Sequence, residues 1–243
     1  MDDHELAADI AREAGELLLE LQARKATKDE GDRLSNDLIL ARLADARPDD
    51  AILSEESKDA PVRLERERVW IVDPLDGTRE WGEGRTDWAV HVALAFDGIP
   101  RVASVALPGQ HRLLTTAEPP PAPPASGSPK VRLLVSRTRP PAVAEYLAEV
   151  LDAELVPLGS AGAKAMAVVM GDADVYAHSG GQYEWDSAAP VGVATAAGCH
   201  CSRIDGSPLL YNRPDPYLPD LLICRAELAT QVLDAVRAAP EPA

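Results

Sequence analysis

The first part of the chain alternates apolar and charged positions at helical spacing. Five apolar residues recur three or four positions apart, and charged residues fill the gaps between them: Leu6, Ile10, Ala14, Leu17 and Leu21. This spacing predicts an amphipathic helix whose apolar face is ordinary core. A second helix is expected over residues 34–46, because Pro48 ends the pattern.

Two apolar runs that follow each end in acidic residues. Residues 51–53 lead into Ser54-Glu55-Glu56, and the uninterrupted run 69–72 stops at Asp73-Pro74. Runs of this kind are typical of buried strands. Because Pro74 cannot donate a ladder hydrogen bond, we expect the second strand to end there. Both strands therefore deliver carboxylates at their ends.

The remaining pattern divides the chain in two. Residues 88–116 alternate like a strand meander, and His91 within it is interpreted as a sheet histidine rather than a ligand. The proline-rich stretch 118–129 is the best domain boundary, with a long hairpin loop as the alternative. Beyond it, strand-like and helix-like segments alternate, which indicates an α/β lobe. We therefore expect an N-terminal α+β lobe (1–125) and a C-terminal α/β lobe (126–243).

The segments expected in this second lobe follow from the same pattern. Strands are predicted over 131–136, 155–158, 173–178, 199–204 and 221–224. Helices are predicted over 141–151, 163–170 and 186–197 and from residue 227 onward.

Composition and charge narrow the classes of function. The chain has 243 residues, 46% of them hydrophobic, which suits a globular protein with a substantial core. Its formal net charge of −16, without a dense Lys/Arg run, argues against a nucleic-acid polymer as partner. A small anionic substrate remains compatible, because bound metal ions reverse the local sign of an acidic site.

Three further features of the sequence predict the cellular compartment of the protein. The chain has only three cysteines, an acidic first segment unlike a signal peptide, and no apolar run approaching about 18 residues. We therefore expect a cytoplasmic protein that does not span a membrane. The Cys199-His200-Cys201 run is interpreted as small packing residues, since no second Cys/His pair is near it.

Candidate chemistry gathers in Asp73-Pro74-Leu75-Asp76-Gly77-Thr78. Two carboxylates three positions apart, with the Leu75 carbonyl, offer the oxygen ligands that Mg²⁺ prefers. Gly77 would let a phosphate approach the backbone, and a helix starting near Thr78 would turn free N–H groups toward an anion. The alternative is a plain β-turn rich in Asp and Gly.

Three further acidic residues are candidates for the same site. If the first two strands are neighbours, Glu55 lies next to Asp73, where like charges repel unless a cation bridges them. Asp186, at an expected helix start, is either an N-cap or a further metal ligand. Asp32, which heads the second expected helix, is either an N-cap or the group that polarises the Thr78 hydroxyl.

Together these segments resemble a known family. Residues 73–78 match the D-P-(I/L)-D-G-(S/T) signature of the inositol monophosphatase superfamily. The upstream Glu55-Glu56 and the downstream Trp185-Asp186 follow in the family's order, as do Ala188-Ala189-Pro190 and Ala197-Gly198.

Within that superfamily the chain is similar to the CysQ branch of 3′(2′),5′-bisphosphate nucleotidases, above all to its actinobacterial members. The segments that suggest this branch are Asp76-Gly77-Thr78-Arg79-Glu80-Trp81, Ser136-Arg137, Gly159-Ser160-x-x-x-Lys164 and Asp205-Gly206-x-Pro208-Leu209-x-Tyr211-Asn212.

The resemblance implies a fold and a set of site residues. The fold is a layered α-β-α-β-α sandwich of the sugar-phosphatase type, with two or three Mg²⁺ ions between the lobes. Glu55, Asp73 and the Leu75 carbonyl would hold one ion, and Asp73, Asp76 and Asp186 another. Asp32, Thr78 and Glu55 would activate water. The implied substrate contacts are Gly77, Thr78, Ser136, Arg137, Arg139, Ser160, Lys164, His178 and Asp186. For Lys164, a solvated helix lysine is the alternative.

The implied activity is Mg²⁺-dependent hydrolysis of the 3′-phosphate of 3′-phosphoadenosine 5′-phosphate to AMP and phosphate, as in sulfate assimilation. The sulfated precursor of this nucleotide is a second candidate substrate. An inositol monophosphatase or fructose-1,6-bisphosphatase is the nearest rival, and a non-catalytic protein that binds phosphate ligands is another. The resemblance also implies sensitivity to lithium. The oligomeric state stays open, with a homodimer among the options.

Overall fold

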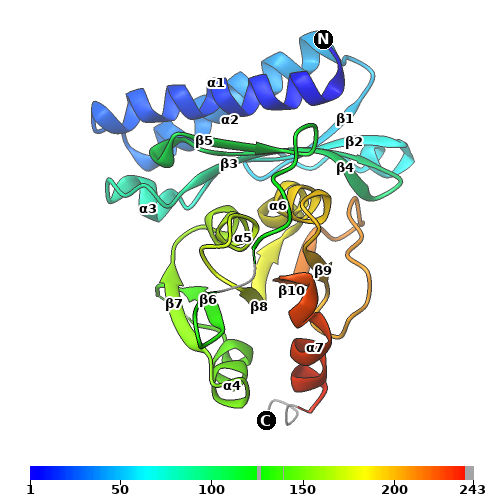
Figure 1. The fold of residues 1–243 in the computed structure, drawn as a ribbon. Helices are drawn as coiled ribbons and strands as arrows, with labels where there is room; N and C mark the ends of the chain where they lie inside the picture. Colours follow the sequence, from blue (N-terminus) through cyan, green and yellow to red (C-terminus); the bar gives the residue numbers. More distant parts are fainter. Residues whose placement is uncertain (125–126, 139, 239–243) are drawn as a thin grey trace.

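The chain folds into five layers (Figure 1). The computed structural model describes residues 1–124, 127–138 and 140–238. The outer layer is formed by α1 (Asp3–Ala23) and α2 (Lys28–Ala46), the middle layer by α5 (Ala161–Val169) and α6 (Glu184–Ala196), and the far layer by α4 (Ala142–Val150) and α7 (Ala229–Arg237). One five-stranded sheet lies between each pair of helical layers. This arrangement confirms the expected α-β-α-β-α sandwich.

The first sheet has the strand order β1-β2-β3-β4-β5. Its members are β1 (Ala51–Ser54), β2 (Arg68–Asp76), β3 (Ala89–Phe96), β4 (Ile99–Leu107) and β5 (Arg112–Thr115). β1 and β2 are parallel and the other pairs antiparallel, so the expected meander is confirmed. In β2, Val69 and Ile71 pack toward α5 and α6, whereas Trp70 and Val72 pack toward α1 and α2. Burial on both faces explains the uninterrupted apolar run of this strand.

The second sheet has the order β7-β6-β8-β10-β9. Its members are β6 (Arg132–Ser136), β7 (Glu154–Leu158), β8 (Val175–Tyr183), β9 (His200–Ser202) and β10 (Tyr217–Cys224). β6 pairs in parallel with β7 and β8, while β10 is antiparallel to β8 and β9. The alternation expected for the second half is therefore confirmed. The expected lobe boundary between residues 125 and 126 falls outside the described residues.

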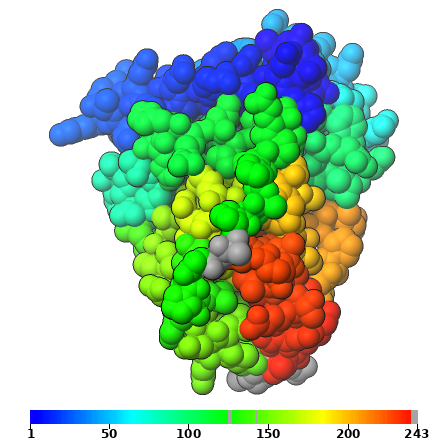
Figure 2. All heavy atoms as spheres, viewed as in Figure 1, coloured from blue at the N-terminus to red at the C-terminus, as the bar shows by residue number. Residues whose placement is uncertain are grey.

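Short helical elements connect these layers. Helix α3 (Thr78–Gly82) follows the left-handed Gly77 directly. Short 3-10 segments span Pro61–Glu65, Pro108–Gln110 and Ala226–Leu228. Figure 2 shows α1, in blue, lying across one end of the molecule, with α7, in red, packed in the opposite half. Within the described ranges, no helix combines the length and apolar character needed to cross a membrane.

Two expectations about element ends are wrong. Helix α2 begins at Lys28, where the Thr27 side chain accepts a hydrogen bond from the Glu30 N–H at 3.2 Å, so Asp32 lies inside the helix and is not its N-cap. β2 continues through Pro74 to Asp76, and its pairing with β3 shifts register between Asp73 and Asp76. An irregularity of this kind tolerates proline, because no ladder hydrogen bond is needed from that residue.

Candidate active site

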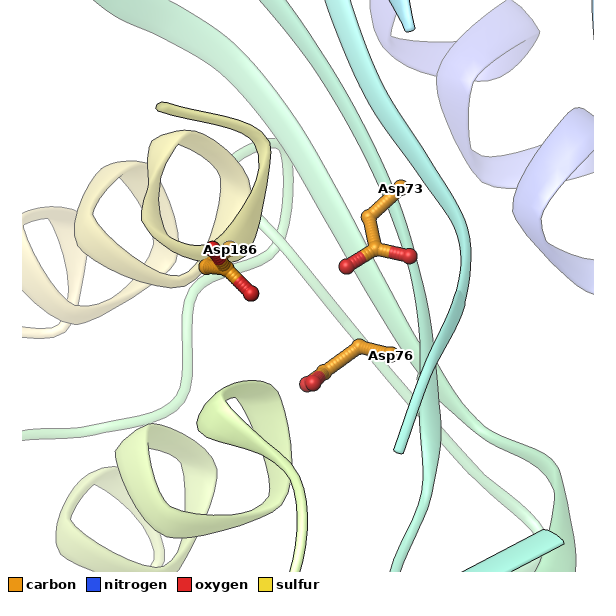
Figure 3. A group of neighbouring side chains, drawn as sticks. All are labelled: Asp73, Asp76 and Asp186. Carbon is orange, nitrogen blue, oxygen red and sulfur yellow. The ribbon is translucent and has the colours of Figure 1, made fainter. Parts of the chain in front are cut away.

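Three aspartates meet where β2 faces the start of α6 (Figure 3). Asp73 and Asp76 come from β2 and Asp186 from the first turn of α6. Each offers one carboxylate oxygen, and these oxygens lie within 4.8 Å of one another. Asp73 and Asp76 are buried. Like charges packed this closely repel, so the chemistry of this donor set fits a hard multivalent cation.

Backbone groups fix two of these side chains. The Leu75 N–H donates to Asp73 Oδ1 at 3.0 Å, and the Tyr183 N–H donates to Asp186 Oδ2 at 2.6 Å. Asp186 is the third helical residue rather than the N-cap, a position that belongs to Tyr183. Its carboxylate closes a capping box. Asp186 therefore stabilises the start of α6 and joins the acidic group, and the alternative that it is the N-cap is wrong.

The third aspartate, Asp76, is held by the N-terminus of α5. Its carboxylate accepts hydrogen bonds from the Ala161 N–H at 3.0 Å, the Gly162 N–H at 2.6 Å and the Ser160 hydroxyl. Ser160 adopts a φ of 53°, which is strained for a residue other than glycine. Its hydroxyl also accepts the Ala163 N–H at 3.0 Å, so the strained residue both caps α5 and orients Asp76.

His91, a residue of β3, lies against this group. The ring is fully buried, and its Nε2 lies 3.3 Å from Asp76 Oδ2. Nδ1 lies 3.0 Å from the Trp185 carbonyl oxygen. In the pairing of β2 with β3, His91 stands directly opposite Asp73. The available sequence signal was a single histidine within a strand of small apolar residues.

The electrostatics of the group follow from burial and mutual repulsion. Burial, followed by the charge of Glu55, raises the pKa of Asp73 well above its ordinary value. Burial, followed by the charge of Asp76, raises the pKa of Asp186 to about 7. For Asp76 burial acts in the same direction, but His91, the Ser160 hydroxyl and the Gly162 N–H together outweigh it and lower the pKa to about 2. Without a cation the site therefore holds protons, which an entering metal ion displaces.

Glu55 lies at the edge of the acidic group. It follows β1, which pairs with β2, and its N–H donates to the Val72 carbonyl at 3.4 Å. The residue as a whole is exposed and stands outside the 4.8 Å group. Glu55 nevertheless lines the same cleft as Asp186. Burial of the carboxyl, followed by the charge of Asp186, raises the pKa of Glu55 to about 7.

Asp32 and Thr78 lie together, as the sequence predicts. The Thr78 hydroxyl is 3.3 Å from Asp32 Oδ1 and 3.1 Å from the Leu75 carbonyl oxygen. Burial, followed by the charge of Glu56, raises the pKa of Asp32 to about 6. An α2 carboxylate therefore reaches across to the first residue of α3.

A cleft of about 840 Å³ opens over this site. Eight of the residues expected from the sequence line it: Glu55, Gly77, Thr78, Ser136, Ser160, Lys164, His178 and Asp186. Lys164 is only 5% exposed and donates to the Ser160 carbonyl, so the alternative of a solvated helix lysine is wrong.

The structure describes one of the two arginines expected to contact the substrate. Arg137 is not among the residues that line the cleft, and its guanidinium forms ion pairs with Glu80 at 2.9 Å and Glu83 at 2.7 Å. Those two glutamates belong to the segment around α3. Arg139 lies outside the described residues.

The metal-free protein is expected to lose stability as the pH rises from about pH 4 to about pH 7. The pKa values of Asp186 and Glu55 are raised to about 7 and that of Asp32 to about 6. The folded chain then keeps protons that unfolded carboxyls, with pKa values of about 4, have released. The free energy that these groups contribute is complete below about pH 4 and is lost as the pH rises through about 7.

Thermal unfolding with a chelator and with saturating Mg²⁺ tests this linkage. We expect the difference in Tm between the two conditions to widen by several degrees across this range, since about 1 kcal/mol moves the Tm of a domain of this size by about 2–4 °C. A difference in Tm that stays constant across the range would contradict the proton-bearing acidic group.

The fold and this acidic site define a class of protein. The sequence matches the inositol monophosphatase family over residues 4–241, and the chain belongs to that family. A 3′-phosphoadenosine 5′-phosphate phosphatase from Mycobacterium leprae is 51% identical over 98% of this chain and 94% of the relative. The 3′(2′),5′-bisphosphate nucleotidase CysQ from Escherichia coli is 30% identical over 86% of this chain and 94% of its own length.

Solved structures agree with this assignment. CysQ from Bacteroides thetaiotaomicron superposes with a TM-score of 0.81 at 26% identity, covering 92% of this chain and 97% of that one. An inositol monophosphatase from an Anabaena (Nostoc) species superposes with a TM-score of 0.82 at 21% identity, covering 98% of this chain and 96% of that one. The second likeness shows the fold alone.

Proposed function

We propose that this chain hydrolyses the 3′-phosphate of 3′-phosphoadenosine 5′-phosphate to AMP and phosphate, using two or three Mg²⁺ ions. The observation that carries the proposal is the group formed by Asp73, Asp76 and Asp186, whose oxygens converge within 4.8 Å beside a cleft of about 840 Å³. That volume lies within the usual range for a small-molecule site. The 51% identical relative named for this activity supports the choice of substrate.

The metal ligands would come mostly from the N-terminal lobe. Glu55, Asp73 and the Leu75 carbonyl would hold one ion, and Asp73, Asp76 and Asp186 the other. When bound, the ions supply positive charge to the phosphoryl oxygens and lower the pKa of the attacking water. The C-terminal lobe contributes Asp186 and the α5 N–H groups that orient Asp76. The site therefore needs residues from both halves of the chain.

Side chains of the protein position the water and the substrate. Asp32 accepts a hydrogen bond from the Thr78 hydroxyl, which leaves a Thr78 lone pair free to accept a hydrogen bond from the attacking water. Lys164, buried in the cleft wall, supplies a point charge to a substrate phosphate. A direct contact from Arg137 would first require this guanidinium to leave Glu80 and Glu83. The chain thus contributes position and charge rather than a covalent nucleophile.

A phosphate-release panel tests the proposed substrate. It compares 3′-phosphoadenosine 5′-phosphate with its sulfated precursor, inositol 1-phosphate and fructose 1,6-bisphosphate at saturating Mg²⁺. We expect kcat/KM for the bisphosphate nucleotide to exceed that for either sugar phosphate by at least about a hundredfold. Faster turnover of inositol 1-phosphate would reverse the ranking. Release from none of the four at any Mg²⁺ concentration would favour a non-catalytic binding protein.

A further inference from the structure

Two buried polar atoms in the cleft wall have no hydrogen-bond partner. Across the described part of the chain, four buried side-chain nitrogen or oxygen atoms are unpartnered. Two of them, His178 Nδ1 and Gln182 Oε1, belong to residues that line the cleft. Buried polar atoms in native proteins are nearly always paired, so an orphan in a binding cleft points to a ligand group that completes it.

One end of the Gln182 amide contacts a buried tyrosine. The side chain is 5% exposed, and its Nε2 donates to the Tyr176 hydroxyl at 2.8 Å. Tyr176 is itself buried, with the Lys164 ammonium 5.2 Å from its ring centroid. Oε1 is the amide atom that has no hydrogen-bond partner.

A backbone irregularity precedes this residue. Gly180 and Gly181 have φ values of 80° and 76°, and the pairing of β8 with β10 shifts register at this point. Bulges of this kind re-aim a side chain next to a functional site. Gln182 follows directly after the two glycines, so its direction does not continue the alternation of the strand.

The tautomer of His178 follows from one contact. Its Nε2 lies 2.7 Å from the Gly180 carbonyl oxygen, and because a carbonyl only accepts, Nε2 carries the hydrogen. Burial lowers the pKa of His178, which favours the neutral ring. In that ring Nδ1 is an acceptor. Both unpartnered atoms therefore accept hydrogen bonds.

His178 Nδ1 and Gln182 Oε1 can bind only a part of the substrate that donates hydrogen bonds. Phosphate oxygens are acceptors themselves and cannot satisfy either atom, whereas Lys164 offers charge to them. We infer that Gln182, beside the His178 that the family resemblance already implies as a substrate contact, binds an uncharged hydrogen-bond donor on the alcohol portion of the substrate and thereby sets specificity. In a nucleotide this donor is a ribose hydroxyl or the exocyclic amine of the base. The inference rests on the proposed function.

Two substrate analogues and one variant test the role of Gln182. The 2′-deoxy analogue lacks the free hydroxyl, and the purine riboside 3′,5′-bisphosphate lacks the amine. We expect the wild type to lose about tenfold or more in kcat/KM on one of the two, because a site built to bind a donor rejects the analogue without it. Gln182→Met should lose a similar factor on the full substrate and stay within about threefold of the wild type on that analogue.

Gln182→Glu is the matched variant, because it keeps an acceptor oxygen at the same position. Its added charge is expected to lower kcat/KM for every bisphosphate while preserving the discrimination against the analogue. A wild type that discriminates against neither analogue overturns the inference without any variant. So does a Gln182→Met enzyme that discriminates like the wild type, or one that loses the same factor on every substrate. No hydrolysis of the full substrate by the wild type would instead refute the proposed function.

Discussion

Asp73→Asn is expected to abolish phosphate release, with a loss of more than about a thousandfold in kcat/KM. Asp73 is buried at the centre of the acidic group and is the one residue assigned to both ions. The amide keeps the shape of the side chain but removes the charge. Removing a single oriented donor at an active site already costs about 10²–10³-fold, and a shared ligand acts on two ions at once.

The fold of this variant should remain intact. In the metal-free protein the pKa of Asp73 is raised by burial and by the charge of Glu55, so a neutral amide relieves repulsion instead of creating it. We expect its metal-free Tm to equal or exceed that of the wild type. Asp49→Asn, on the exposed surface after α2, is the matched control and should leave both activity and Tm unchanged. Near-normal turnover by Asp73→Asn would refute the assigned metal site.

Thr78→Val is expected to lower kcat by about 10²–10³-fold with little change in KM, as for the loss of a general-base relay. Valine matches threonine in shape but has no hydroxyl to link Asp32, 3.3 Å away in the wild type, to the attacking water. Thr78→Ser keeps the hydroxyl and should retain most of the activity. Steady-state kinetics at saturating Mg²⁺ provide the measurement. Wild-type kcat in Thr78→Val, or a loss in Thr78→Ser as large as the loss in Thr78→Val, would contradict the role assigned to the hydroxyl.

The helices and strands could be predicted from the sequence because each element carries its own period, whereas the layered sandwich followed from the resemblance to the family. The helical spacing of Leu6, Ile10 and Ala14 and the uninterrupted apolar run of β2 both correspond to real burial. Element ends were harder to place. The strand β2 passes Pro74 because a register shift removes the need for its N–H, and such a shift depends on the neighbouring strand.

The acids of the site could be predicted, but their supports could not. Asp73, Asp76 and Asp186 stand in recognisable motifs. That the Ser160 hydroxyl and the α5 N–H groups hold Asp76 depends on residues 84 to 86 positions away in the chain. His91 and Gln182 lie in strands whose local pattern carries no sign of the cleft. Their places depend on the packing of the two sheets around α5 and α6.

A Mg²⁺ titration of metal-stripped protein tests the central claim most directly. Phosphate release from 3′-phosphoadenosine 5′-phosphate would be followed as Mg²⁺ is added to the wild type and to Asp73→Asn. We predict no release by the chelator-treated wild type, a saturable rise with added Mg²⁺, and no rise in the variant. Release at the full rate without any divalent metal, or an identical titration curve for Asp73→Asn, would contradict the claim that these carboxylates hold the metal ions that drive phosphate hydrolysis.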